Sequence, residues 1–410
     1  MAYLSVIIPA HNEEKTICKT VKSLFQQSYR SFEIVVVDDG STDETTAKLI
    51  REFELSQMEL KQILGSLKHK GIVQILSTAY QGIPLYLLVK ENGGKGDALN
   101  AGIDFSHGTF VVCIDADCVV TACTLGRFAD TLQKEHNITA IGGRVFPTSD
   151  ILHSNRKDRF STEKYLLKYQ ELEYGIAFSI ARPFFDRIGT TMLISGALGL
   201  FRKETVIELG GYSLDTVGED MELVMRIRQR AAKQKCLARI AYDKEASCYT
   251  ELPWNIIDWV KQRIRWTVGL SEVLWKYRSV LTDKEYSVAE KITFLYYLLL
   301  ERYIAHIEMA STIACFLCGA SECALALIQI TIMLQFLLLI AGSYQTILNS
   351  IKSSNHRMRT LMEWIFIMVS FLSVYHLAHL LIRLISVPYY RIKKHVLKSK
   401  SVVWQSPARM

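Results

Sequence analysis

The sequence lacks the features of several common protein classes. Its first half has no long basic block and no stripe of interleaved aromatic and basic residues, so nucleic-acid binding is not expected. Its nine cysteines are an odd number without a paired framework, which favours reduced thiols over disulfides. With 410 residues, 50% of them hydrophobic and 22% charged, the chain is neither disordered nor collagen-like.

Apolar residues are distributed unevenly along the chain. Up to about residue 280 the sequence has the mixed pattern of a globular protein, whereas apolar runs dominate beyond that point. Residues 4–8 already form a strand pattern, so no signal peptide is expected before them and the first part should stay in the cytosol. The formal net charge of +7 is a mild excess, much of it in the last third.

Short β-branched segments alternate with helical patterns in the first part of the chain, which predicts βα units around a mostly parallel sheet. We expect strands at residues 4–8, 33–37, 85–89 and 110–114. Polar clusters follow the ends of successive strands. Because ligands bind at the carboxyl ends of the strands in open α/β sheets, this edge is the expected binding site.

Two acidic groups directly follow predicted strands. Asp115 and Asp117 are two residues apart and share one side of the strand end. Their carboxylates suit Mg²⁺ or Mn²⁺ bound together with a diphosphate. Asp38 and Asp39 follow the second strand, where they could accept hydrogen bonds from a ribose or base, or cap a turn.

Two further groups lie on predicted helices. Glu219 and Asp220 begin an amphipathic run, where the helix dipole alone favours acidic residues. Gln262, Arg265 and Trp266 share one helix face and together suit a sugar. The alternative for these three is a helix with Trp and Arg at lipid headgroups, and both interpretations can hold at once.

Together these residues resemble the family 2 glycosyltransferases and, within them, the processive membrane synthases of cellulose, chitin, hyaluronan and poly-N-acetylglucosamine. The resemblance covers residues 3 to about 270 and is carried by seven motifs in the family's order: 6–13 (VIIPAHNE), 37–43 (VDDGSTD), 95–100 (KGDALN), 115–117 (DAD), 195–199 (SGALG), 219–220 (ED) and 262–266 (QRIRW). The last motif is the most diagnostic. The departures are His11, where the family often has an aromatic residue, and a long link at residues 54–83.

The resemblance implies an α/β nucleotide-sugar-binding fold of the GT-A type and a role for each matching residue. The residues implied to bind the donor sugar nucleotide are Pro9, Glu13, Asp38, Asp39, Lys95, Asn100, Asp115 and Asp117, the last two also holding Mg²⁺ or Mn²⁺. Asp220 would be the catalytic base, with Glu219 beside it. The residues implied for the acceptor and diphosphate are Gln262, Arg263, Arg265 and Trp266.

The reaction implied is transfer from a UDP-sugar, with UDP-N-acetylglucosamine the expected donor, to a growing β-linked polysaccharide. A direct displacement at the anomeric carbon inverts an α-linked donor. One alternative is transfer of a single sugar to a lipid or oligosaccharide. Another is a non-catalytic nucleotide-binding membrane scaffold, whose mark would be the loss of an acidic motif.

We expect a cytosolic glycosyltransferase domain at 1–250, interfacial helices at 251–290, two to three transmembrane helices at 291–390 and a basic tail at 391–410. Residues 323–351 and 364–382 have no formal charge and are long enough to span a bilayer. Residues 292–318 carry Glu301, Arg302 and Glu308, and are either a span or a surface helix. We expect a multi-pass plasma-membrane protein. Because few helices make thin channel walls, a homo-oligomer or a partner membrane subunit is expected.

Overall fold

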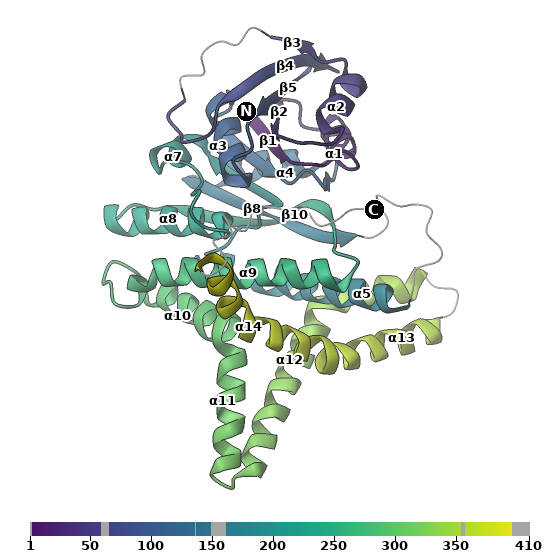
Figure 1. The fold of residues 1–410 in the computed structure, drawn as a ribbon, viewed down its shortest axis with the longest axis vertical. Helices are drawn as coiled ribbons and strands as arrows, with labels where there is room; N and C mark the ends of the chain where they lie inside the picture. The colour runs from purple at the N-terminus through teal and green to yellow at the C-terminus, as the bar shows by residue number, and fades with distance from the viewer. Residues whose placement is uncertain (1, 59–64, 136, 149–160, 354–356, 396–410) are drawn as a thin grey trace. The chain divides into compact units, whose positions relative to one another are not determined.

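The computed structural model describes residues 2–58, 65–135, 137–148, 161–353 and 357–395 (Figure 1). The chain divides into two compact units. Unit 1 contains residues 1–154, 186–251 and 402–410, and unit 2 contains residues 155–185 and 252–401. The segment 155–185, which we expected inside the first domain, therefore belongs to unit 2. Most of the expected basic tail, residues 396–410, lies outside the described residues.

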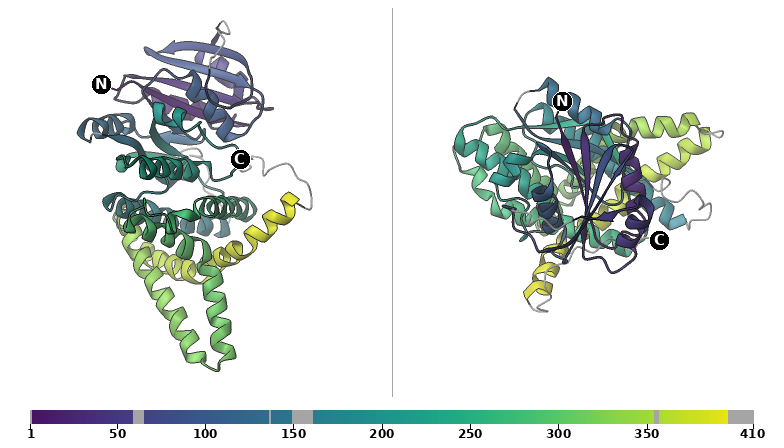
Figure 2. Two further views of the ribbon diagram at one scale, coloured as in Figure 1. Left: turned by 90° about the vertical axis from the view of Figure 1, so that its left-hand side faces the viewer. Right: turned by 90° about the horizontal axis from the view of Figure 1, so that it is seen from above.

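Unit 1 is built on a ten-stranded sheet with the order β3-β4-β5-β2-β1-β6-β9-β8-β10-β7. The strands are β1 (Leu4–Ala10), β2 (Phe32–Asp39), β3 (Ser56–Gln57), β4 (Ile72–Tyr80), β5 (Ile83–Lys90), β6 (Phe110–Ile114), β7 (Cys118–Val120), β8 (Ile138–Thr148), β9 (Leu198–Arg202) and β10 (Arg239–Glu251). The right panel of Figure 2 shows the strands fanning out, as the twist of a sheet requires.

The four strands predicted from the sequence form the parallel centre of this sheet, since β5, β2, β1 and β6 pair in parallel. Every residue of β2 is buried, as a strand covered on both faces requires. The strands beside this centre are joined antiparallel, β4 to β5 and β9 to both β6 and β8. Beyond them β8 and β10 pair in parallel, while β7 joins β10 and β3 joins β4 antiparallel. The sheet is therefore mixed, and the expectation of a mostly parallel sheet is confirmed only in part.

The difference arises from local turns that the strand patterns did not reveal. The link at residues 54–83 contains β3 and β4, and β4 returns into β5 through Gln81 and Gly82, which both have positive φ. Two consecutive residues of positive φ are the geometry of a tight hairpin turn, which forces antiparallel pairing.

The helices of unit 1 are α1 (Ile17–Phe25), α2 (Thr45–Phe53), α3 (Lys95–Phe105), α4 (Thr124–Lys134), α7 (Lys203–Glu208) and α8 (Glu219–Gln234). One core cluster joins α3 and α8 to the sheet, with Leu99 and Leu223 packed among residues such as Ile7, Val35 and Val111. Because α3 and α8 both start at the site described below, this packing fixes the position of their first residues.

Every secondary-structure element in the described part of unit 2 is a helix. Its elements are α5 (Ser161–Ile176), η1 (Ala177–Ala181), α9 (Ile256–Lys276), η2 (Arg278–Leu281), α10 (Val288–Tyr296), η3 (Tyr297–Tyr303), α11 (Ile304–Leu317), α12 (Ser321–Ser353), α13 (Arg357–Ser370), η4 (Phe371–Tyr375) and α14 (His376–His395), while α6 (Arg182–Arg187) crosses from unit 2 into unit 1. Helices α11 and α12 form a hairpin (Figures 1 and 2), and Gly319 at its turn has φ +70°.

Two observations bear on the membrane expectation. Many large apolar side chains of α11 to α14 are exposed, among them Leu325, Phe366 and Leu377. Within the described ranges, however, no helix combines the length and the apolar character needed to cross a membrane. The expected transmembrane helices are therefore not confirmed.

Candidate active site

Four charged side chains from three distant segments meet in unit 1. Lys95 is the first residue of α3, Asp115 follows the end of β6, and Glu219 and Asp220 begin α8. The Lys95 ammonium lies 2.6 Å from an Asp115 carboxylate oxygen and 4.0 Å from one of Glu219. The structure thus brings together residues that the sequence analysis assigned to the donor site and to catalysis.

The charge of Lys95 is stabilised by this arrangement. Burial opposes the ammonium form, but the carboxylates of Asp115, Glu219 and Asp220 outweigh burial and raise the pKa of Lys95. Lys95 is therefore a permanent cation among three carboxylates. Such a group can both hold the acidic side chains together and attract a phosphate.

The Asp220 carboxylate has a fixed orientation. One of its oxygens accepts a hydrogen bond from the Met221 N–H at 2.8 Å, and the other accepts one from the Gly196 N–H at 3.2 Å. Gly196 leaves little room here, because a Cβ atom at this position would lie 2.9 Å from the Lys95 ammonium. The motif at residues 195–199 therefore places a glycine, which has no side chain, beside Lys95 and Asp220.

Asp115 and Asp117 fit a divalent cation that takes its other ligands from a bound diphosphate. Both side chains are partly exposed, and Asp117 accepts a weak hydrogen bond from the Cys118 thiol at 3.5 Å. In the described part of the chain, no three His, Cys, Asp or Glu side chains are grouped so that they could hold a metal by themselves. Magnesium commonly binds through one or two carboxylates plus substrate phosphates, so two carboxylates suffice.

The Asp39 carboxylate is fully buried and serves the loop before α3. It accepts hydrogen bonds from the Lys90 ammonium at 2.6 Å and from the N–H groups of Gly93 and Gly94 at 2.9 and 2.7 Å. Lys90 also lies 2.6 Å from Asp97, and all three charged side chains are at most 4% exposed. This buried triad, Asp39–Lys90–Asp97, anchors the turn that presents the first residue of α3.

Lys90 was not among the residues predicted from the sequence. The signal was present, because a lysine ends the otherwise apolar strand β5, and a charge that is buried at the end of such a strand needs an opposite charge beside it.

The remaining residues expected to bind the donor are buried in the same unit. Asp38 accepts a hydrogen bond from the Ser41 N–H at 2.8 Å, and Glu13 accepts one from the Thr16 hydroxyl at 2.9 Å. Pro9 lies within β1. The Asn100 side chain accepts a hydrogen bond from the Tyr212 N–H at 2.6 Å and donates one to the Tyr212 carbonyl at 3.0 Å. Their side chains hold neighbouring loops, and their roles in donor binding stay predictions.

In unit 2, Arg263 of the QRIRW motif is 1% exposed and belongs to a buried cluster. Its guanidinium pairs with Glu173 of α5 and donates to the His379 ring at 3.2 Å and to the Tyr375 hydroxyl at 3.4 Å. Burial would raise the pKa of Glu173, but Arg263 outweighs burial and the pKa is lowered. Glu173 was not predicted from the sequence, because it is one of several charged residues of α5 and carries no motif.

Arg263 therefore differs from the other members of its motif. Its charge is engaged in joining α9 to α5 and α14, whereas Gln262 and Arg265 are partly exposed and Trp266 is 41% exposed. The Arg263 guanidinium also stacks on the Trp266 ring, 4.1 Å from its centroid. Arg263 thus supports the Trp266 ring from the buried side. The acceptor-site roles expected for the four residues of the motif stay predictions.

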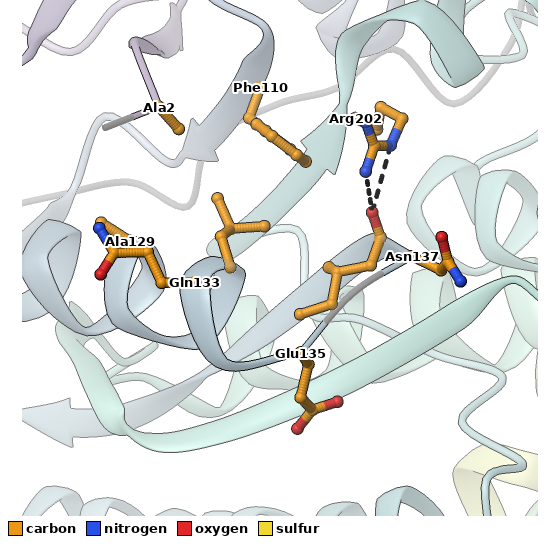
Figure 3. Close-up of a pocket in the computed structure, with 9 residues that line it drawn as sticks. Ala2, Phe110, Ala129, Gln133, Glu135, Asn137 and Arg202 are labelled. Carbon is orange, nitrogen blue, oxygen red and sulfur yellow. Dashed lines mark hydrogen bonds between the residues drawn. The ribbon is translucent and has the colours of Figure 1, made fainter.

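Figure 3 shows a separate cavity in unit 1, of about 330 Å³. Phe110, the first residue of β6, and Arg202 line it, and the Arg202 guanidinium donates to the Ile138 carbonyl at 3.0 and 3.2 Å. Asp115 follows the opposite end of β6. The cavity is therefore not part of the charged site.

Comparisons with known proteins agree with the motifs. The family described as "Glycosyltransferase like family 2" matches residues 2–269. The poly-beta-1,6-N-acetyl-D-glucosamine synthase of Staphylococcus aureus strain COL is 24% identical over 305 residues, which are 74% of this chain and 61% of that protein. The synthase of the same name from Staphylococcus epidermidis is 26% identical over 316 residues, 77% of this chain and 64% of that protein. The chain thus spans less than two thirds of the length of these relatives.

Among solved structures, a mannosyltransferase from Pyrobaculum calidifontis in complex with GDP-Man and Mn²⁺ has a TM-score of 0.55 at 20% identity. The match covers 84% of this chain and 86% of that one. At this identity the likeness concerns the fold alone.

Proposed function

The chain belongs to the glycosyltransferase-like family 2, and from this premise we propose that it transfers N-acetylglucosamine from UDP-N-acetylglucosamine to the end of a growing β-linked polysaccharide. The observation that carries the proposal is the meeting of Lys95, Asp115 and Asp220, since a donor diphosphate and an acceptor hydroxyl need a cation and a carboxylate in one place. The choice of sugar is supported by the names of the two staphylococcal relatives.

The donor side of the reaction is assigned to Lys95, Asp115 and Asp117. Lys95 binds the diphosphate of the donor, and its neighbouring carboxylates keep it protonated while it does so. Asp117 and Asp115 would hold a Mg²⁺ or Mn²⁺ ion, which when bound would stabilise the negative charge of the leaving diphosphate.

The acceptor side is assigned to Asp220. The acceptor hydroxyl oxygen forms a bond to the anomeric carbon while the bond from that carbon to the UDP oxygen breaks, and the hydroxyl proton passes to the Asp220 carboxylate. Two backbone N–H groups orient that carboxylate. Because attack and departure occur on opposite faces, the α-linked donor gives a β-linked product.

Retention of a polymer is assigned to unit 2. Trp266, exposed above the buried Arg263, offers a flat apolar surface for a sugar ring, with Gln262 and Arg265 on the same helix face to hydrogen-bond hydroxyls. We also propose that the chain is bound to the plasma membrane through the exposed apolar residues of α11 to α14, with unit 1 in the cytosol.

The experiment that tests this function offers a panel of UDP-sugars to membranes that contain the protein, with Mn²⁺ or Mg²⁺, and measures UDP release and the size of the labelled product. We expect high-mass product from UDP-N-acetylglucosamine alone. Products of one or two added sugars would favour transfer to a lipid or oligosaccharide. UDP binding without release from any donor would favour the scaffold alternative, or a requirement for a partner subunit, which adding the host membrane extract would test.

A further inference from the structure

A second charged group, in unit 2, has no part in the reaction described above. Arg302 lies in the π-helical segment η3 and is only 5% exposed. Its Nε and Nη1 atoms are buried and have no hydrogen-bond partner among the residues that the structure describes. The guanidinium lies over the Tyr303 ring, 4.7 Å from its centroid. A buried guanidinium whose donors are not satisfied destabilises the folded state, and an anion bound beside it would remove this cost.

The neighbouring acidic residue does not supply that anion. Glu301 pairs with Arg383 of α14 at 3.2 Å and accepts a hydrogen bond from the Tyr296 hydroxyl at 2.8 Å. Arg383 also donates to the Leu300 carbonyl at 3.2 Å, so its guanidinium is fixed in place. The positive charge of Arg383 acts unfavourably on Arg302, and an anion between them would relieve this repulsion.

A third donor lies one turn further along the chain. The ring of His306 is close enough for the charge of Arg302 to act on it, and its buried Nδ1 atom has no partner in the described part of the chain. The helix is π-helical at Arg302, and π-helical turns are frequent at functional sites. Three nitrogen-bearing side chains from three elements of unit 2, Arg302 of η3, His306 of α11 and Arg383 of α14, are thus close enough for their charges to interact, and Arg302 and His306 keep buried nitrogen atoms without a partner in the described part of the chain.

The surface beside this position is apolar. Leu299, Tyr303 and Ile307 of η3 and α11 are 41 to 45% exposed, and so are not needed to fill the core. A ligand that satisfies both features has an anionic head and a hydrocarbon chain.

We propose that Arg302, Arg383 and His306 form a binding site for a phosphate ester, carried by a lipid whose chains lie on Leu299, Tyr303 and Ile307. The planar guanidinium fork matches phosphate oxygens and is weakly hydrated, which suits a buried ion pair. The assignment does not depend on the catalytic roles proposed above. A soluble phosphate ester has the same chemistry at its head, and the experiment distinguishes the two sources.

The test uses the purified full chain in detergent micelles and measures its thermal unfolding midpoint with three additions: phosphatidic acid, a diacylglycerol with the same chains, and glycerol 3-phosphate. We expect phosphatidic acid to raise the midpoint and diacylglycerol to leave it unchanged, because a ligand that binds the folded state stabilises it. An equal rise with glycerol 3-phosphate at the same concentration would support the phosphate site but assign it to soluble esters. A rise with diacylglycerol equal to that with phosphatidic acid would overturn the proposal.

Substitutions of Arg302 make the test specific. Arg302→Met removes an unsatisfied buried charge, so without lipid its midpoint should be equal to or above that of the unsubstituted chain, and the phosphatidic acid effect should vanish. Arg302→Lys keeps the positive charge but lacks the planar pair of donors of the guanidinium. It should need at least about ten times more phosphatidic acid to reach half of the rise in the midpoint. Arg278→Met, at an exposed arginine of η2, is the matched control and should respond normally. If phosphatidic acid raised the midpoint of either Arg302 variant as much as that of the unsubstituted chain, the proposal would be contradicted. If Arg302→Met does not fold, the result with Arg302→Lys alone decides the test.

Discussion

Replacing Asp220 by asparagine is expected to lower the rate of sugar transfer about 1,000-fold while leaving the affinity for the UDP-sugar almost unchanged. Asparagine has nearly the same shape, and its one carbonyl oxygen can still accept the hydrogen bond from Met221 or from Gly196, but it cannot take a proton from the acceptor. The loss should therefore appear in kcat rather than in KM for the donor. Continuous measurement of UDP release at saturating donor gives kcat, and calorimetric titration with UDP gives the binding affinity.

The matched control is Asp215→Asn, at an exposed acidic residue of the segment that leads into α8. It makes the same chemical change five residues away and should retain the activity of the unsubstituted chain. If Asp220→Asn kept more than about a tenth of the rate, another group would have to accept the proton, and the assignment of the base would be wrong.

Replacing Lys90 by methionine is expected to destabilise unit 1 by about 3–5 kcal/mol, because it leaves the buried carboxylates of Asp39 and Asp97 without their shared cation. The same change should lower the transfer rate, since Asp39 then loses the partner that fixes it beneath Gly93 and Gly94. Unfolding of the purified full chain in denaturant, followed by pulse proteolysis, measures the loss of stability.

Two further variants separate the buried triad from general effects of a lost lysine. Lys244→Met, at an exposed position of β10, should change stability by less than about 0.5 kcal/mol. The double variant Lys90→Met/Asp97→Asn should be more stable than Lys90→Met alone, because it removes one of the two unpaired charges. A double variant less stable than the single one would show that the triad does not act as an ion cluster.

The parallel centre of unit 1 could be predicted from the sequence because buried parallel strands are continuous apolar runs. The runs at 4–8, 33–37, 85–89 and 110–114 lie within β1, β2, β5 and β6. The antiparallel strands could not be predicted in the same way. The pairing of β9 with both β6 and β8 depends on contacts between segments that are far apart in sequence, and the pattern of one segment does not encode its neighbour.

The candidate site was predicted in part, for a similar reason. Lys95, Asp115, Glu219 and Asp220 carry local motifs, and the structure brings them together. Glu173 and Lys90 carry no motif, and what makes each of them important is burial beside an opposite charge. That property depends on tertiary packing, which is why Arg263 was assigned to the acceptor site although its guanidinium is engaged with Glu173 inside unit 2.

The measurement that tests the central claim most directly is the anomeric configuration of the product formed from UDP-N-acetylglucosamine, read by proton NMR before any later change to the polymer. A single displacement in which Asp220 takes the acceptor proton requires inversion, so every new linkage should be β. An α-linked product would mean that the sugar is not transferred by a single inverting displacement, and would contradict the account of this site.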